Sequence, residues 1–127
     1  MSLTALLRCN DLDGTREYYR DILGFDVTDT TEGTLSVRCE EACLVFTVQD
    51  LWAVRTGCSA TFYFHVDDVS QYFERVKGLA EIAWPLQDMP YGTREFGVRD
   101  CNGYYLTFVR MSDDSSSFTQ QATQVSV

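Results

Sequence analysis

The chain contains one pattern of residues twice. In each copy a threonine precedes an aspartate by seven positions, as Thr4 precedes Asp11 and Thr61 precedes Asp68. Further along, an aromatic pair, an aliphatic residue and a glycine recur without a gap, in Tyr18-Tyr19-x-x-Ile22-x-Gly24 and Tyr72-Phe73-x-x-Val76-x-Gly78. Internal similarity of this kind indicates two copies of one supersecondary unit.

Hydrophobic periodicity predicts the elements of the first copy. Apolar residues at helical spacing around Tyr18 and Ile22 predict a helix that ends at Gly24, with Asp13 or Thr15 as its N-cap. Short apolar or alternating runs predict strands over residues 4–9, 26–31, 35–39 and 42–48. Because only short turns separate the last three runs, we expect them to form hairpins.

The second copy repeats this order. A helix is predicted from Val69, Tyr72, Phe73 and Val76, which share one helical face, with Asp68 as the cap. Strands are predicted over residues 61–66, 81–84, 94–99 and 104–110, and a loop with two prolines over 85–93. Each copy is therefore expected to be a βαβββ unit, and the fold class α+β.

A chain of 127 residues has the length of one domain. We predict a single domain over residues 1–111, with units at 3–48 and 61–110 and a link at 49–60. One such unit leaves a face of its sheet bare, so two can enclose a cavity between their bare faces. The polar segment 112–127 is expected to be a flexible tail.

Charge and composition exclude several classes of function. Acidic residues outnumber basic ones 19 to 10, for a net charge of −9. Such a surface repels nucleic acid and would attract a cationic small molecule. The chain contains no apolar run that could cross a bilayer, no secretory signal pattern and no CxxC motif among its five cysteines. We therefore expect a cytoplasmic protein with reduced thiols, without a membrane or nucleic-acid partner.

Four runs carry a resemblance to a known family: NDL at 10–12, YYRDILGF at 18–25, FHVDDV at 64–69 and YGTREFGVRDCNG at 91–103. Together they resemble the vicinal oxygen chelate superfamily, which includes glyoxalase I, extradiol dioxygenases, and the fosfomycin and bleomycin resistance proteins. The resemblance covers residues 3–110. It implies two βαβββ units that form a curved mixed sheet around a cavity, and a homodimer.

The resemblance also implies where a metal would be held. Metal-dependent relatives carry histidines on the first strand of each unit, a glutamate on the last strand and, in glyoxalase I, a fourth ligand. The matching positions here are Thr4, Thr61, Thr107 and Val45. Threonine hydroxyls and a valine are poor ligands for a divalent transition metal, so we predict no metal and no other cofactor.

Strand alternation extends these positions to a whole surface. If they face the cavity, so do Leu6, Arg8, Cys43, Thr47, Tyr63, His65, Tyr105 and Val109. The alternate positions are apolar and are expected to pack under the helices. Aromatic walls with a few polar groups are typical of small-molecule sites. The predicted ligand residues are Thr4, Arg8, Val45, Trp52, Thr61, Tyr63, His65, Tyr91, Tyr105 and Thr107.

Two of the three aromatic residues expected near the cavity mouth have open roles. Trp52 and Trp84 can stack a ligand or simply cover the core or a subunit contact. Tyr91 is assigned to the ligand, because bleomycin resistance proteins use an aromatic at the matching position in their groove.

We therefore predict a metal-free protein of the bleomycin-resistance type that sequesters a flat or cationic aromatic molecule, with no catalytic residue. One alternative is a glyoxalase-like lyase or isomerase, or a dioxygenase-related enzyme, with a non-standard metal site. Another is a metal-free enzyme with His65 as general base and Arg8 holding an anionic substrate. A purely structural role is disfavoured by the polar cavity face.

Overall fold

The computed structural model describes residues 3–53 and 59–111. The described residues form two compact units: one comprises 3–53, 59–60 and Asp100–Tyr104, and the other comprises Thr61–Arg99 and 105–111. The predictions for the tail 112–127 and for part of the link 49–60 lie outside the described residues. No described helix is long and apolar enough to span a membrane.

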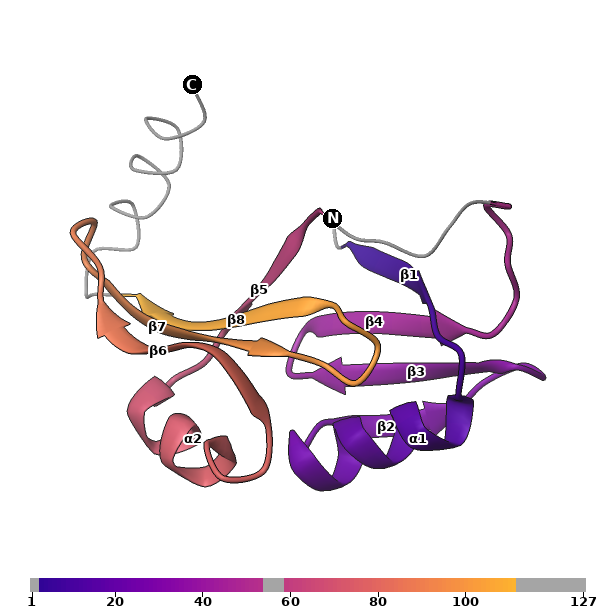
Figure 1. Cartoon of the computed structure of the whole chain (residues 1–127), viewed down its shortest axis with the longest axis horizontal. Coiled ribbons are helices and arrows are strands. Elements are labelled where there is room, and N and C mark those ends of the chain that lie inside the picture. Colours follow the sequence, from indigo (N-terminus) through magenta and orange to yellow (C-terminus); the bar gives the residue numbers. More distant parts are fainter. Residues whose placement is uncertain (1–2, 54–58, 112–127) are drawn as a thin grey trace. The chain divides into compact units, whose positions relative to one another are not determined.

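The first unit has the predicted βαβββ order (Figure 1). Its elements are β1 (Thr4–Arg8), α1 (Leu12–Glu17), the π-helical turn η1 (Tyr18–Ile22), β2 (Asp26–Asp29), β3 (Thr34–Cys39) and β4 (Ala42–Thr47). The sheet order is β1-β4-β3-β2, with β1 parallel to β4 and the other pairs antiparallel. The helix supplies the crossover that a parallel strand pair requires.

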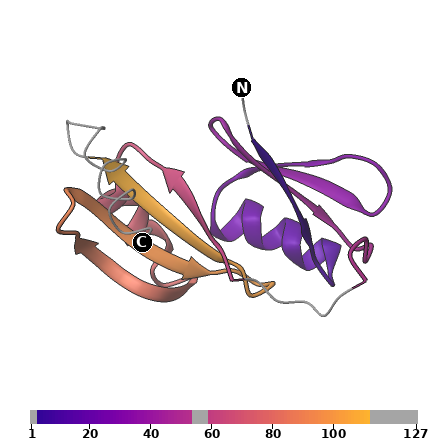
Figure 2. The same cartoon turned by 90° about the horizontal axis from the view of Figure 1, so that it is seen from above.

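The second unit repeats this topology, and Figure 2 shows its β5 and β8 side by side. Its elements are β5 (Thr61–His65), α2 (Val69–Val76), β6 (Glu81–Asp88), β7 (Thr93–Arg99) and β8 (Tyr105–Met111). The order is β5-β8-β7-β6, with β5 parallel to β8. The duplication inferred from the sequence is therefore confirmed.

One of the two predicted helix caps is correct. Asp68 accepts a hydrogen bond from the backbone N–H of Gln71 at 3.0 Å and caps α2 as expected. The prediction of Asp13 or Thr15 as the cap of α1 is wrong, because Asp11 accepts the N–H of Gly14 at 3.1 Å. Asp11 has the extended backbone of an N-cap, which starts the helix earlier than its apolar periodicity indicates.

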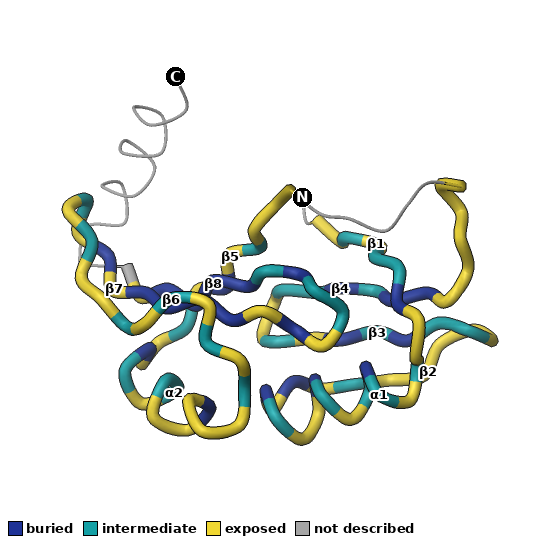
Figure 3. Tube along the Cα trace, in the orientation of Figure 1, coloured by how far each residue is buried: buried dark blue, intermediate teal, exposed yellow. Residues whose placement is uncertain are grey.

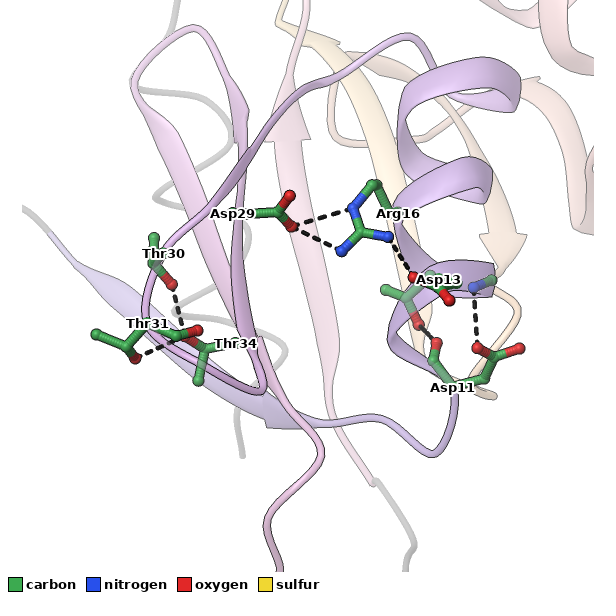
Figure 4. Close-up of polar contacts among 9 residues, drawn as sticks. Asp11, Asp13, Arg16, Asp29, Thr30, Thr31 and Thr34 are labelled. Atoms are coloured by element: carbon green, nitrogen blue, oxygen red, sulfur yellow. Dashed lines mark hydrogen bonds and ion pairs between the residues drawn. The ribbon is translucent and has the colours of Figure 1, made fainter.

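Arg16 joins α1 to the strand beside it (Figure 4). Its guanidinium donates to Asp29 on β2 at 2.7 and 3.0 Å and to Asp13 at 2.6 Å. The two carboxylates are largely exposed to solvent, so the pairs orient β2 against α1 but add little to stability.

The apolar core of each unit lies on the helix-facing side of its sheet. Figure 3 shows that buried positions gather on β3, β4, β7 and β8. In the first unit the Tyr19 and Phe46 rings lie 5.1 Å apart, and in the second Tyr72 and Phe108 lie 4.8 Å apart. The residues predicted to lie under the helices are buried at Leu44, Phe46, Phe64, Leu106 and Phe108. Phe62 and Val66 are only partly buried, and Val48, which follows the end of β4, is 42% exposed.

The predicted loop over 85–93 is wrong in its first half. Strand β6 continues through Pro85 to Asp88, and a short turn with Gly92 at φ 90° follows. Two register shifts, before and after Trp84, accommodate the irregular stretch. A proline is tolerated here because β6 is an edge strand, where a missing N–H does not interrupt the sheet.

The segment Asp100–Tyr104 joins β7 to β8 in sequence but packs with the first unit. Asp100 Oδ1 accepts the backbone N–H of Asn102 and of Tyr104, and Oδ2 accepts the Tyr19 hydroxyl at 2.5 Å. Tyr104 in turn donates its hydroxyl to the carbonyl of Arg8 at 2.6 Å. A buried carboxylate with three donors is thus the centre of this turn.

Candidate functional site

In the first unit, three of the predicted ligand residues share one face of the sheet. The register pairs Thr4 with Cys43, Leu6 with Val45 and Arg8 with Thr47, so Thr4, Arg8 and Val45 face the same side. Arg8 forms an ion pair with Asp50 at 3.5 Å. Trp52, the fourth predicted residue of this unit, lies exposed in a bend after β4.

In the second unit, five predicted ligand residues share a face. The register pairs Thr61 with Tyr105, Tyr63 with Thr107, and His65 with Val109. The residues on β5 are exposed, Tyr63 by 45%, whereas Thr107 on the central strand β8 is fully buried. The predicted alternation of the strands is correct, and the mixed polar and aromatic character of this face follows from it.

An aromatic pair lies on this face. The rings of Trp84 and Tyr105 are nearly parallel, 10° between planes with 6.0 Å between centroids. Gly97 pairs with both Trp84 and Thr107, and a Cβ at position 97 would stand 2.0 Å from Trp84 Cε2. The indole can therefore lie flat on the sheet only because residue 97 has no side chain.

A buried carboxylate lies two residues from this glycine. Glu95 pairs with Val109, which places it on the same face as Gly97, and it is only 4% exposed. The Tyr91 hydroxyl donates to Glu95 Oε1 at 3.2 Å. Three buried oxygens of this face, Glu95 Oε2, Thr93 Oγ1 and Thr107 Oγ1, have no hydrogen-bond partner among the described residues.

The environment shifts the titration of these groups. Burial raises the pKa of the Glu95 carboxyl, and the hydrogen bond from Tyr91 opposes this shift. Burial and the nearby carboxyl of Glu95 raise the pKa of Tyr91 to about 12, and the same causes raise the pKa of Tyr63. Both phenols therefore remain protonated at neutral pH, and an anion here would be the Glu95 carboxylate.

The sequence profile of the Glyoxalase/Bleomycin resistance protein/Dioxygenase superfamily matches residues 3–108. The chain belongs to this superfamily. No curated protein matches the sequence.

Solved structures show the fold of the superfamily. TioX from Micromonospora sp. ML1 is 22% identical, with a TM-score of 0.72, and the match covers 88% of this chain and 99% of that one. A glyoxalase/bleomycin resistance protein/dioxygenase from Alicyclobacillus acidocaldarius is 17% identical, with a TM-score of 0.73 and coverage of 90% and 93%. A "conserved domain protein" reaches a TM-score of 0.77 at 19% identity, covering 88% of this chain and all of that one.

The residues at the superfamily's metal positions do not fit a divalent transition metal. Thr4, Thr61 and Thr107 offer neutral hydroxyls, and Val45 offers no donor atom. Within the ranges 3–53 and 59–111, no three His, Cys, Asp or Glu side chains gather where they could hold a metal ion. Glu95 and His65 lie on the same face of the second sheet, but no third such side chain gathers with them among the described residues.

The sequence analysis missed Glu95, and it ended the strand at Trp84 although β6 continues to Asp88. Strand alternation along 94–99 already predicts that Glu95 shares a face with Gly97 and Arg99. Only the pairing of Gly97 with Thr107 shows that this is the face that carries the predicted ligand residues. For the end of β6 the misleading signal was Pro85, which argued against a strand beyond Trp84.

Proposed function

We propose that the chain binds a flat or cationic aromatic molecule on the face of the second sheet that carries Trp84 and Glu95, without a metal and without chemical change to the ligand. The observation that supports this most is the Trp84 indole, which lies over Gly97 and nearly parallel to the Tyr105 ring. A parallel aromatic surface beside a carboxylate suits a planar, positively charged group. Sequestration of such a molecule would be a binding function of the bleomycin-resistance type.

The chemistry of the two sheet faces supports the same proposal. The helix-facing side is filled with apolar rings, whereas the other side carries hydroxyls, phenols and a carboxylate. A protein that needed only a stable core would gain from apolar side chains at the buried positions of Glu95, Thr93 and Thr107, because buried polar groups without partners cost free energy. Their retention is what a ligand-binding surface requires.

Thr61, Tyr63, His65 and Tyr91, the other predicted ligand residues of the second unit, remain part of this proposal. Thr4, Arg8, Val45 and Trp52 belong to the first unit and are not part of the proposed surface. We also propose that the protein acts as a cytoplasmic homodimer. The oligomeric state is tested by measuring the mass of the purified protein in solution.

Tryptophan fluorescence tests the binding proposal directly. In a Trp52→Phe background, Trp84 is the only remaining indole and reports on the aromatic pair. We expect planar cationic compounds to quench it saturably, and a Trp84→Phe variant to bind these compounds more weakly when binding is measured by calorimetry. Trp52→Phe serves as the matched control for the loss of an indole. No saturable response across a broad panel of cationic and neutral planar compounds would overturn the proposal.

Elemental analysis tests the metal-free part of the proposal. We expect protein purified without chelators to contain no stoichiometric transition metal, and divalent metals to leave its melting temperature unchanged. Stoichiometric zinc, nickel, manganese or iron would instead support the lyase, isomerase or dioxygenase-related alternative.

A further inference from the structure

One buried carboxylate oxygen of Glu95 has no hydrogen-bond donor among the described residues. Glu95 Oε1 receives the Tyr91 hydroxyl at 3.2 Å, whereas Oε2 is buried without a hydrogen bond. Burying a carboxylate oxygen without a donor is costly, and proteins normally satisfy such an atom with an N–H, a hydroxyl or a cation. The described residues supply none of these to Oε2.

The neighbouring positions show what kind of group is absent. Thr93 and Thr107 lie on the same face as Glu95, and each also has a buried hydroxyl without a partner. A hydroxyl can accept a hydrogen bond, and an ionised carboxylate can only accept one. The unpartnered oxygen of Glu95 can therefore be satisfied by a group that donates hydrogen bonds, and the carboxylate favours a donor with positive charge.

The Trp84–Tyr105 pair indicates that the rest of the ligand is a planar ring. Trp84 and Gly97 are paired across β6 and β7, and Glu95 lies two residues from Gly97 on the same face. A ring that lies against Trp84 and Tyr105 would thus hold a substituent within reach of Glu95.

We propose that Glu95 is the specificity-determining residue of this surface: its free carboxylate oxygen accepts the N–H groups of an ammonium or amidinium carried by a planar ring. The inference rests on the proposed binding function and adds to it the charge and the donor character of the ligand. An anionic ring is disfavoured by the same carboxylate.

Three probes of nearly identical shape test this proposal: 2-naphthamidine, which is a cation, 2-naphthamide, which is neutral, and 2-naphthoate, which is an anion. Calorimetric titration at neutral pH should show the amidine binding at least about tenfold more tightly than the amide, as expected for charge-assisted hydrogen bonds. The naphthoate should bind most weakly. Equal affinity of the amidine and the amide would overturn the role of Glu95.

Substituting Glu95 tests whether this residue causes the tighter binding of the amidine. We expect Glu95→Gln to abolish the advantage of the amidine while it changes the affinity of the amide less than about twofold. Glu74→Gln is the control, because it removes the same charge from an exposed position on α2, and the advantage should persist. Should Glu95→Gln not fold, Glu95→Met keeps the length of the side chain and has no amide to leave unpaired.

The outcomes separate this proposal from the broader one. If none of the three probes and no compound of the fluorescence panel binds, the binding function itself fails. Two other outcomes leave planar binding intact but show that Glu95 does not determine specificity. In the first, the amide binds and Glu95→Gln weakens the binding of both probes equally. In the second, the amidine still binds more tightly than the amide in Glu95→Gln. In either case a buried water is the simplest partner for Oε2.

Discussion

The indole of Trp84 occupies the space that a side chain at residue 97 would fill, since a Cβ on Gly97 would stand 2.0 Å from Trp84 Cε2. The glycine therefore does more than relax the backbone of β7. It allows a large ring to lie flat on the sheet beside Tyr105, on the face that also buries Glu95.

Gly97→Ala should displace the indole. We expect a loss of stability of about 1–3 kcal/mol from overpacking, a shift of the Trp84 emission in a Trp52→Phe background, and weaker binding of planar probes. Gly78→Ala is the matched control, because a Cβ there meets no atom within 4 Å. Urea unfolding measures the stability. An unchanged emission spectrum in the Gly97 variant would contradict the close contact between the two residues.

Tyr19→Phe should destabilise the protein through the turn at Asp100. The variant removes the hydroxyl that donates to Asp100 Oδ2, and leaving a buried acceptor without its donor costs about 1–3 kcal/mol. Burial raises the pKa of Asp100, and the Tyr19 hydrogen bond lowers it, so the bond stabilises the ionised form. Loss of this bond raises the folded-state pKa further.

The difference in the free energy of unfolding between the wild-type protein and Tyr19→Phe should therefore shrink as the pH falls and Asp100 becomes protonated. Unfolding in urea at neutral pH and at about pH 4 measures this change. Tyr105→Phe provides a control, because no hydrogen bond of its hydroxyl is involved in the turn. A stability difference that stays constant with pH would show that the variant is not destabilised through its lost hydrogen bond to the Asp100 carboxylate.

Glu95→Gln should stabilise the free protein at neutral pH. Burial raises the folded-state pKa of Glu95 above its unfolded value, so the folded state binds the proton more tightly. The wild-type protein therefore loses stability as the pH rises from the unfolded pKa through the folded one, and the neutral glutamine removes this loss. Thermal unfolding over a pH series should show the advantage of the variant vanishing in acid, whereas Glu74→Gln should show no comparable trend.

Binding of 2-naphthamidine should weaken as the pH falls through the raised pKa of Glu95, while binding of 2-naphthamide stays constant. The other titratable groups on this face include Tyr63 and Tyr91, whose raised pKa values keep them neutral, and His65, which lies across Val109 from Glu95. Arg99 and Tyr105, which pair with each other across β7 and β8, lie on the same face. Protonated His65 would also repel the cation, so the titration is repeated in His65→Gln. A pH dependence that disappears in this variant would assign it to the imidazole.

Local patterns in the sequence were sufficient for the architecture. The duplicated spacing around Asp11 and Asp68 predicted two βαβββ units, and two-residue alternation predicted correctly that Tyr63 and Thr107 share a face. These inferences succeed because helical and strand periodicities are short-range properties, which each segment satisfies on its own. The same alternation assigned Phe64 and Phe108 to the buried side.

The candidate site depended on contacts that no local pattern contains. The bond from Tyr19 to Asp100 spans 81 positions, and the contact of Trp84 with Gly97 depends on two register shifts in β6. Glu95 became a site residue only when the pairing of β7 with β8 set its phase and burial left one oxygen without a donor. Residue periodicity thus determines which side chains share a strand face, whereas tertiary packing decides which of them lose their water and which remain without a partner.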